Sequence, residues 1–257
     1  MPAPAPLPAL VDTLAASGGS PRLTAYDADG ERVELSGAVL ANWVAKTTNL
    51  LVEELDVAPG STVRLDLPAH WRTLVWAMAT WRAGGCVVLG QQDGTDVVVT
   101  DRPEPGVADA VVAVALPALA RRFDGTLPPG AVDAAAAVMT YGDVVGWTPA
   151  TDPAAPAVRA GVAVGPQTAG DAEVTEVDHA ALAGWATAGT TSAPGDRVLL
   201  AADPDRATVP RWLRTALGVL LGGGSLVLVG PALAVELATD PARRDRLVAT
   251  ERVTAGA

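Results

Sequence analysis

Apolar residues fall into short blocks of strand length and longer blocks of helix length, and the two kinds alternate along most of the chain. Short runs rich in Val, Leu and Ala are typical of buried strands, whereas apolar residues spaced three and four apart are typical of amphipathic helices. We expect strands at residues 23–27, 31–35, 62–67, 84–90, 96–101, 158–164, 196–202 and 224–230. We expect helices at residues 36–51, 71–81, 116–122, 132–141, 178–185 and 209–221.

The first of these blocks form a hairpin followed by a capped helix. Asp29-Gly30 is a turn signal between two strand-like runs, and the Ser36 hydroxyl is suited to cap the helix that begins after it. The apolar face of that helix consists of Leu40, Trp43, Val44, Thr47, Leu50 and Leu51.

Repeated alternation of strands and helices predicts an α/β fold in which largely parallel sheet layers are flanked by helices. A segment rich in Pro, Ala and Gly, Thr148 to Pro156, interrupts the pattern and resembles a linker. We therefore expect a first α/β subdomain at residues 1–150 and a second one at residues 151–257.

Composition narrows the possible functions. The net charge is −11, from 29 acidic and 18 basic residues, and no basic stripe offsets it locally, so nucleic acids and anionic membrane surfaces are not expected partners. The N-terminal stretch lacks the basic residues of a secretory signal, which makes a cytoplasmic location the default expectation.

The single cysteine, Cys86, lies in an apolar run and is expected to be a core residue. Asp93, Asp96 and Asp101 are expected to be turn residues around a strand rather than metal ligands.

Three stretches carry a resemblance to a known family. They are the helix, strand and helix leading into "RAGGCVVL", the run "DHAAL…APGDRVLLAADP", and the run "LLGGGSLVLVG…RDRLVATERVTAGA". In order and spacing they resemble the N-terminal part of the adenylate-forming superfamily, the AMP-binding and acyl-CoA synthetase-like enzymes, and especially short uncharacterised actinobacterial relatives. The resemblance implies the α/β fold predicted above, and ATP, AMP or CoA as ligands of an active member.

The family's phosphate-binding loop has the signature S-G-T-T-G-x-P-K-G, and two segments compete for its place. Ala188 to Ser192 reads AGTTS but follows His179, whereas the family loop precedes the corresponding histidine. Counting back from His179 places the loop at Gly165 to Val174. We therefore expect the AGTTS segment to be unrelated to phosphate binding, and His179 to be a structural residue or a possible pocket residue.

The residues at the loop position are poorly suited to hold a triphosphate. Thr168 and Gly170 match the signature, but Pro166 has no N–H to donate and Gln167 places a side chain where glycine allows close approach. Glu173 stands where the family has its lysine, which replaces an attraction by a repulsion of about 4 kcal/mol for unit charges roughly 4 Å apart. The only lysine of the chain, Lys46, lies on the first long helix, where we expect a solvated surface position.

We therefore expect a truncated, catalytically silent relative, a pseudoenzyme with no catalytic residues, cofactor or metal of its own, because the printed chain also stops before the family's later motifs. It would act as a binding, regulatory or interaction module, associating with itself or with a full-length adenylate-forming partner. Two alternatives remain. One is an ATP-dependent acid ligase that is complete only with a partner chain, and the other is a small-molecule binder that keeps a pocket without chemistry.

Overall fold

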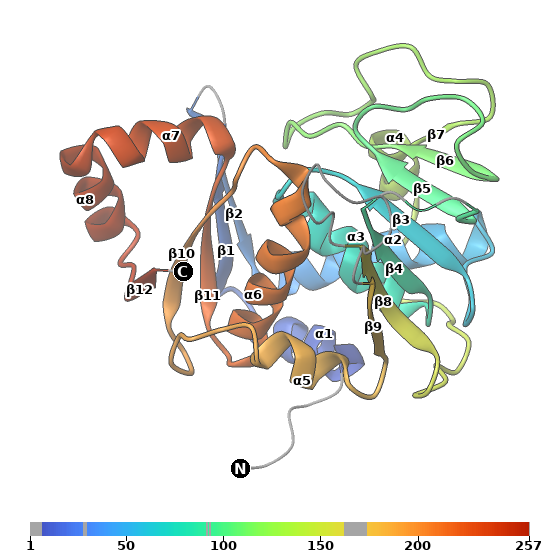
Figure 1. Cartoon of the computed structure of the whole chain (residues 1–257), viewed down its shortest axis with the longest axis horizontal. Coiled ribbons are helices and arrows are strands. Elements are labelled where there is room, and N and C mark those ends of the chain that lie inside the picture. The colour runs from blue at the N-terminus through green and yellow to red at the C-terminus, as the bar shows by residue number, and fades with distance from the viewer. Residues whose placement is uncertain (1–6, 28–29, 91, 93, 162–173, 257) are drawn as a thin grey trace. The chain divides into compact units, whose positions relative to one another are not determined.

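The computed structural model shown in Figure 1 describes residues 7–27, 30–90, 92, 94–161 and 174–256. The chain forms two compact units that are each built from separate segments. Unit 1 comprises Met1–Ala41, Pro68–Leu74 and Ala183–Ala257, and unit 2 comprises Asn42–Leu67 and Val75–Leu182. The predicted division was a single break at residue 150. The compact units follow strand pairing instead. In both sheets, strands from before residue 150 pair with strands from after it: β4 pairs with β8, and β1 pairs with β11.

Unit 1 contains a five-stranded sheet with the strand order β12-β10-β11-β1-β2. Its elements are α1 (Leu7–Ala16), β1 (Pro21–Tyr26), β2 (Arg32–Ser36), α5 (Leu182–Thr187), β10 (Arg197–Ala201), α6 (Val209–Leu221), β11 (Ser225–Val229), α7 (Pro231–Thr239), α8 (Pro241–Thr250) and β12 (Ala255–Gly256). The pairs β12-β10, β10-β11 and β11-β1 are parallel, and only β1-β2 is antiparallel. The hairpin predicted around Gly30 is therefore confirmed, as is the cap of the following helix, since Val39 N donates to Ser36 Oγ at 3.2 Å.

Unit 2 contains a seven-stranded sheet with the order β7-β6-β5-β3-β4-β8-β9. Its strands are β3 (Thr62–Asp66), β4 (Cys86–Leu89), β5 (Val97–Thr100), β6 (Ala110–Ala113), β7 (Val132–Asp133), β8 (Pro156–Gly161) and β9 (Val174–Asp178). Every pair is parallel except β8-β9. Its helical elements are α4 (Ala134–Ala137) and parts of α2 (Gly37–Glu53) and α3 (Trp71–Arg82), both of which begin in segments of unit 1. The predicted α/β class with largely parallel sheets is thus confirmed.

The α2 and α3 helices supply much of the core because apolar residues occupy several of their faces. Leu40, Val44, Leu50 and Leu51 of α2 are fully buried, as are the three tryptophans of α3. Such helices are typical of α/β proteins, where sheet and helix layers exclude water from both sides of the buried elements.

One predicted helix was wrong. Residues 116–122 form bends and a turn, because Pro117 interrupts the apolar spacing and the Leu119 side chain is 90% exposed, so no apolar face is buried there. The predicted helix at residues 209–221 agrees with α6 at both ends. Among the described residues, no helix has the length and apolar character needed to cross a lipid bilayer.

Candidate functional site

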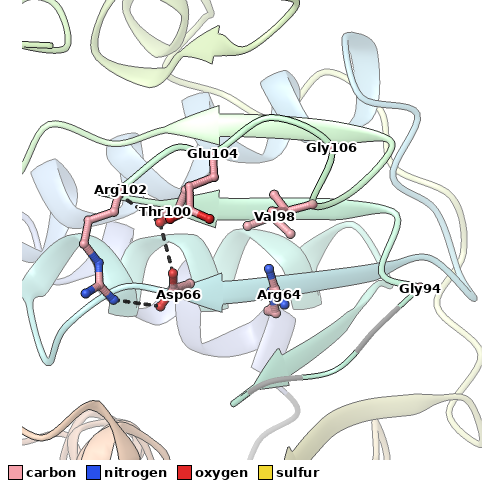
Figure 2. A pocket seen from close by; sticks show the side chains of 9 residues that line it. Arg64, Asp66, Gly94, Val98, Thr100, Arg102, Glu104 and Gly106 are labelled. Atoms are coloured by element: carbon pink, nitrogen blue, oxygen red, sulfur yellow. Dashed lines mark hydrogen bonds and ion pairs between the residues drawn. The ribbon is translucent and has the colours of Figure 1, made fainter. Parts of the chain in front are cut away.

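A polar cavity of about 680 Å³ lies on one face of β3 and β5 in unit 2 (Figure 2). It is lined by Arg64, Asp66, Gly94, Val98, Thr100, Arg102, Glu104, Gly106 and Val107. Figure 2 shows the side chains of β3 and β5 projecting from the strands, with Arg102 and Glu104 reaching the same face from the connection that follows β5. The volume lies within the range of about 300–1,000 Å³ that small-molecule sites occupy in proteins.

The alternation of side chains along β3 places two charged residues on the cavity face. Val63 and Leu65 are buried in the core, so Arg64 and Asp66 point to the opposite side of the strand. Arg64 lies beside Val98 and Asp66 beside Thr100 in the register of β3 with β5. The pairing therefore brings a cation, a carboxylate and a hydroxyl onto one surface.

An unusually short connection keeps this face free of a covering helix. β4 ends at Leu89 and β5 begins at Val97, on either side of β3 in the sheet. Parallel strands are usually joined by a dozen or more residues that include a helix, but here seven residues make the crossing. None of those the structure describes, residues 90, 92 and 94–96, is helical. The connection from β5 to β6, residues 101–109, also contains no helix. Both connections contribute residues to the cavity lining, and neither covers the cavity with a helix.

Hydrogen bonds and an ion pair organise the charges of the cavity. Asp66 Oδ1 pairs with Arg102 Nη2 at 3.5 Å, and Asp66 Oδ2 accepts from the Thr100 hydroxyl at 3.2 Å. Arg102 N donates in turn to Thr100 Oγ1 at 3.0 Å, which orients that hydroxyl towards the carboxylate. Arg64 Nη1 donates to the carbonyl of Gln92 at 3.4 Å. Among the lining residues that the structure describes, two carry guanidinium groups and two, counting Glu104, carry carboxylates.

This arrangement is suited to binding a polar molecule. Guanidinium groups present planar sets of N–H donors that match carboxylates and phosphates, and carboxylates accept from ammonium and hydroxyl groups. Sequence reasoning missed every residue of this cavity. The available signal was the run "TVRLDL", in which an apolar strand carries charges at alternating positions, 64 and 66.

The predicted phosphate-loop position lies outside the described residues. Residues 165–173, with Gly165, Pro166, Gln167, Thr168, Gly170 and Glu173 among them, belong to a segment about which the structure makes no statement, and β9 begins at Val174. Their role as a degenerate phosphate loop stays a prediction.

Both histidines make hydrogen bonds within their own unit. His179 Nε2 lies 3.2 Å from the carbonyl of Gly84, and burial lowers the pKa of this imidazole despite that hydrogen bond. His179 is not among the residues that line the cavity on β3 and β5. His70 directly precedes α3; its Nδ1 accepts from the Arg72 amide at 3.2 Å, which directs Nε2 to Asp27 Oδ2 at 3.3 Å.

The segment Ala188 to Ser192 forms a turn between α5 and β10, and the expectation that it is unrelated to phosphate binding stays a prediction. The Gly189 and Thr190 amides donate to carbonyls of α5, and the Ser192 amide donates to Thr190 Oγ1. These amides are engaged within the chain, and the segment leads into a strand rather than into a helix N-terminus, where anions are favoured.

Three other residues singled out in the sequence have structural partners. Lys46 Nζ pairs with Asp143 Oδ1 at 2.8 Å and donates to the Tyr141 carbonyl at 2.6 Å; the predicted solvated position was wrong, since its side chain is only 19% exposed. Cys86 is buried as predicted, and burial raises the pKa of its thiol to about 11. Asp96 Oδ2 accepts from the Thr62 amide and hydroxyl, both at 2.7 Å, which lowers the pKa of this carboxyl.

Comparison with solved structures shows what this architecture resembles. An acyl-CoA synthetase from Brucella canis superposes with a TM-score of 0.67 at 19% identity, over 88% of this chain and 43% of that chain. The amide bond synthetase McbA from Marinactinospora thermotolerans superposes with a TM-score of 0.63 at 17% identity, over 98% of this chain and 48% of that chain. The chain thus spans less than half the length of these synthetases and shares the fold of that part of them, which is the fold that the resemblance implied.

A sequence relative is more closely similar and has nearly the same length. It is a TIGR03089 family protein from Mycobacterium tuberculosis strain H37Rv, 36% identical over 248 residues, which cover 91% of this chain and 90% of the relative. No protein-family model matches the chain. On the strength of that relative, the chain belongs to the TIGR03089 family and has the fold of part of an adenylate-forming enzyme.

Proposed function

We propose that this chain is a catalytically silent member of the adenylate-forming fold that acts as a binding or regulatory module. The observation that carries the proposal is the position of Lys46. The sequence holds no other lysine, and this ammonium is already committed to Asp143 and to the Tyr141 carbonyl on a side chain that is mostly buried. A lysine that moves to a triphosphate would have to give up both partners.

The residue types at the predicted phosphate-loop position support the same proposal. A triphosphate carries several negative charges, which proteins balance with converging backbone amides and with cationic side chains. Pro166 contributes no amide hydrogen, and Glu173 adds a negative charge in a chain whose net charge is already −11. We therefore expect magnesium-ATP to bind poorly to this chain.

Calorimetric titration of the purified chain with magnesium-ATP, together with a pyrophosphate-exchange assay over a panel of carboxylic acids, tests the proposal. We expect no saturable heat and no exchange. Saturable magnesium-dependent binding with measurable exchange would show that the chain is an enzyme and would overturn the proposal.

A restored loop gives the matched control for the same assay. The double substitution Gln167→Gly and Glu173→Lys returns a glycine and an ammonium to the predicted position, so we expect it to gain nucleotide affinity. The pair Gln91→Gly and Glu53→Lys makes the same chemical changes elsewhere, with Glu53 at an exposed position of α2, and should gain none. Equal affinity in the two double variants would contradict the proposed register of the loop.

Association with other chains is part of the proposal. A regulatory module of this kind would bind a second copy of itself or a full-length adenylate-forming protein, and the competing proposal is a ligase completed by such a partner. Light scattering of the purified chain and exchange assays on co-purified complexes separate these cases. The split ligase would be favoured if exchange activity appeared only in a complex. That activity should then disappear when residues 165–174 of this chain, the predicted loop position, are replaced by alanines.

A further inference from the structure

We propose that residues 139–147 of unit 2, together with the end of α2 to which they are hydrogen-bonded, form a docking surface for an arginine-containing, partly apolar segment of another protein. The inference rests on the role as an interaction module proposed above and names the chemistry of the partner. Its tests involve no nucleotide, so they are independent of the result with magnesium-ATP.

Large apolar side chains are concentrated at the surface of this segment. Six such side chains are exposed among the residues that the structure describes, and three of the six lie within nine consecutive positions. They are Met139, Val144 and Trp147, which are 60%, 79% and 69% exposed. Single exposed apolar residues are common on proteins, but a group of them is typical of an interaction site, and Trp and Met are enriched in such sites.

Hydrogen bonds to α2 hold the backbone of the segment in place. Asn49, which is 4% exposed, donates through Nδ2 to the Val144 carbonyl at 2.9 Å and accepts through Oδ1 from the Gly146 amide at 3.0 Å. Lys46 Nζ donates to the Tyr141 carbonyl at 2.6 Å. The exposed side chains therefore project from an anchored backbone, so a partner that binds them pays little for ordering this segment.

Carboxylates border the exposed apolar side chains. Glu53 is the last residue of α2, Glu54 follows it, and both are exposed, as is Asp143 within the segment. A Cβ added to Gly146 would lie 3.7 Å from Glu53 Oε1, which places this carboxylate beside the residue that precedes Trp147. Asp143 is paired with Lys46, whereas Glu53 has no ion-pair partner among the described residues. The surface is therefore apolar with an excess of negative charge.

This combination favours an arginine on the partner. A guanidinium can stack on the indole ring of Trp147 and donate hydrogen bonds to the Glu53 carboxylate, since arginine combines both kinds of contact in one planar group. Met139 and Val144 offer apolar contacts to the residues beside that arginine. A second copy of this chain is a poor fit, because a two-fold contact through this surface would set the carboxylates of Glu53 and Glu54 against their own counterparts.

Three short peptides test the proposal on the full chain. They are the acetylated and amidated pentapeptide Leu-Arg-Leu-Arg-Leu, the same peptide with neutral citrulline in place of arginine, and the same peptide with glutamate in place of arginine. We expect the arginine peptide to shift the backbone amide resonances of Gly142 and Gly146 and the indole N–H resonance of Trp147 in nuclear magnetic resonance spectra. It should bind about tenfold more tightly than the citrulline peptide, and its affinity should fall as sodium chloride is raised, because the charges are exposed.

Two variants assign the contacts to the arginine. Trp147→Ala and Glu53→Gln change exposed side chains, so both should fold normally, and each should weaken binding of the arginine peptide by about threefold or more. Glu53→Gln should leave the affinity of the citrulline peptide unchanged, which separates a direct contact from a structural effect. Leu119→Ala and Asp124→Asn are the matched controls, since both residues are exposed in unit 2 outside the docking surface, and both variants should bind like the unaltered chain.

The outcomes are decisive in both directions. Binding of the arginine peptide that depends on Trp147 and on Glu53 supports the proposal. It is overturned if the citrulline or glutamate peptide binds as tightly, if no resonance of the segment shifts, or if either variant binds like the controls. Light scattering of the free chain tests the other occupant: a dimer that Trp147→Ala dissociates would assign the surface to a second copy and would also overturn the proposal.

Discussion

Glu251 connects the end of α8 to the sheet of unit 1, and replacing it tests how much that connection stabilises the unit. The carboxylate is 5% exposed and accepts from the Tyr26 hydroxyl at 2.5 Å, from Arg197 Nη2 at 2.5 Å and from Arg32 Nη2 at 3.0 Å. The Arg197 side chain is only 16% exposed, so it would remain nearly buried without its carboxylate in a Glu251→Gln variant. Arg32 is 42% exposed and regains water, and for that reason adds little to the cost.

The expected cost of Glu251→Gln is about 3 kcal/mol, the lower end of the range for breaking a buried ion pair, because glutamine keeps one accepting oxygen. For a chain of this size that corresponds to a decrease in Tm of about 6–12 °C. Urea unfolding followed by circular dichroism measures it. Glu236→Gln is the control, since its partner Arg243 and Glu236 itself are about half exposed and such a pair contributes about 0.5 kcal/mol or less.

The pH dependence of the same pair of proteins provides a second test. Burial raises the pKa of Glu251, but the hydrogen bonds from Tyr26, Arg197 and Arg32 outweigh it, so the pKa lies below its usual 4.5. A depressed carboxyl pKa stabilises the folded state above 4.5, and that stabilisation is lost as the pH falls through the folded value. The stability difference between the unaltered chain and Glu251→Gln should therefore be constant at neutral pH and shrink below pH 4.5. Equal urea midpoints for Glu251→Gln and Glu236→Gln would refute this reasoning.

Three further predictions concern unit 2. Trp81→Phe removes a hydrogen bond from Nε1 to the Ala157 carbonyl, 2.7 Å long, from a side chain that is 1% exposed, and should lower the free energy of unfolding by about 2 kcal/mol in urea titrations. Because burial lowers the pKa of His179, the unfolded chain binds more protons than the folded chain below pH 6.5, and the free energy of unfolding should decrease as the pH falls through that value. The decrease should be smaller in His179→Gln, whose amide can still donate a hydrogen bond to the Gly84 carbonyl. Cys86, buried and with a thiol pKa raised to about 11, should react with a thiol reagent at pH 8 only after unfolding.

Each of these has a result that would contradict it. Trp147 is 69% exposed, so a Trp81→Phe variant no less stable than Trp147→Phe would show that burial of Trp81 contributes nothing. A His179→Gln variant with an unchanged pH profile would assign the dependence to other groups. Modification of Cys86 in the folded chain at the rate seen in urea would show that its surroundings open readily.

The order of the central helices and strands could be predicted from the sequence, because each is marked by capping residues or apolar spacing within its own segment. Ser36 and the apolar spacing after it define α2, and the residues from Val209 to Leu221 define α6 to within one residue at each end. Helices α7 and α8 were not predicted. Pro231 and Pro241 stand in their first turns, where proline is tolerated, although a proline is more often taken as the end of an element.

The cavity could not be predicted because it depends on long-range pairing. The alternating charges of β3 are visible in the sequence, but the partner of Asp66 comes from the segment after β5, and the bare face results from a connection whose course only the sheet order reveals. A strand with a cation at its centre would ordinarily indicate an exposed edge. Here Arg64 lies on β3, the central strand of the seven-stranded sheet, and a charged residue on a central strand marks the candidate site.

The pairing of β1 with β11 affects how the chain must fold during its synthesis. Leu23 of β1 lies beside Leu226 of β11. One edge of β1 therefore has no pairing strand until β11 leaves the ribosome, roughly 200 residues or about 10–40 s later at ordinary rates of translation. All of the segments that build unit 2 emerge in the meantime. The nascent chain therefore carries an apolar strand with an open edge while the strands of its second sheet are already available to pair, and an open strand edge of this kind favours aggregation until β11 emerges.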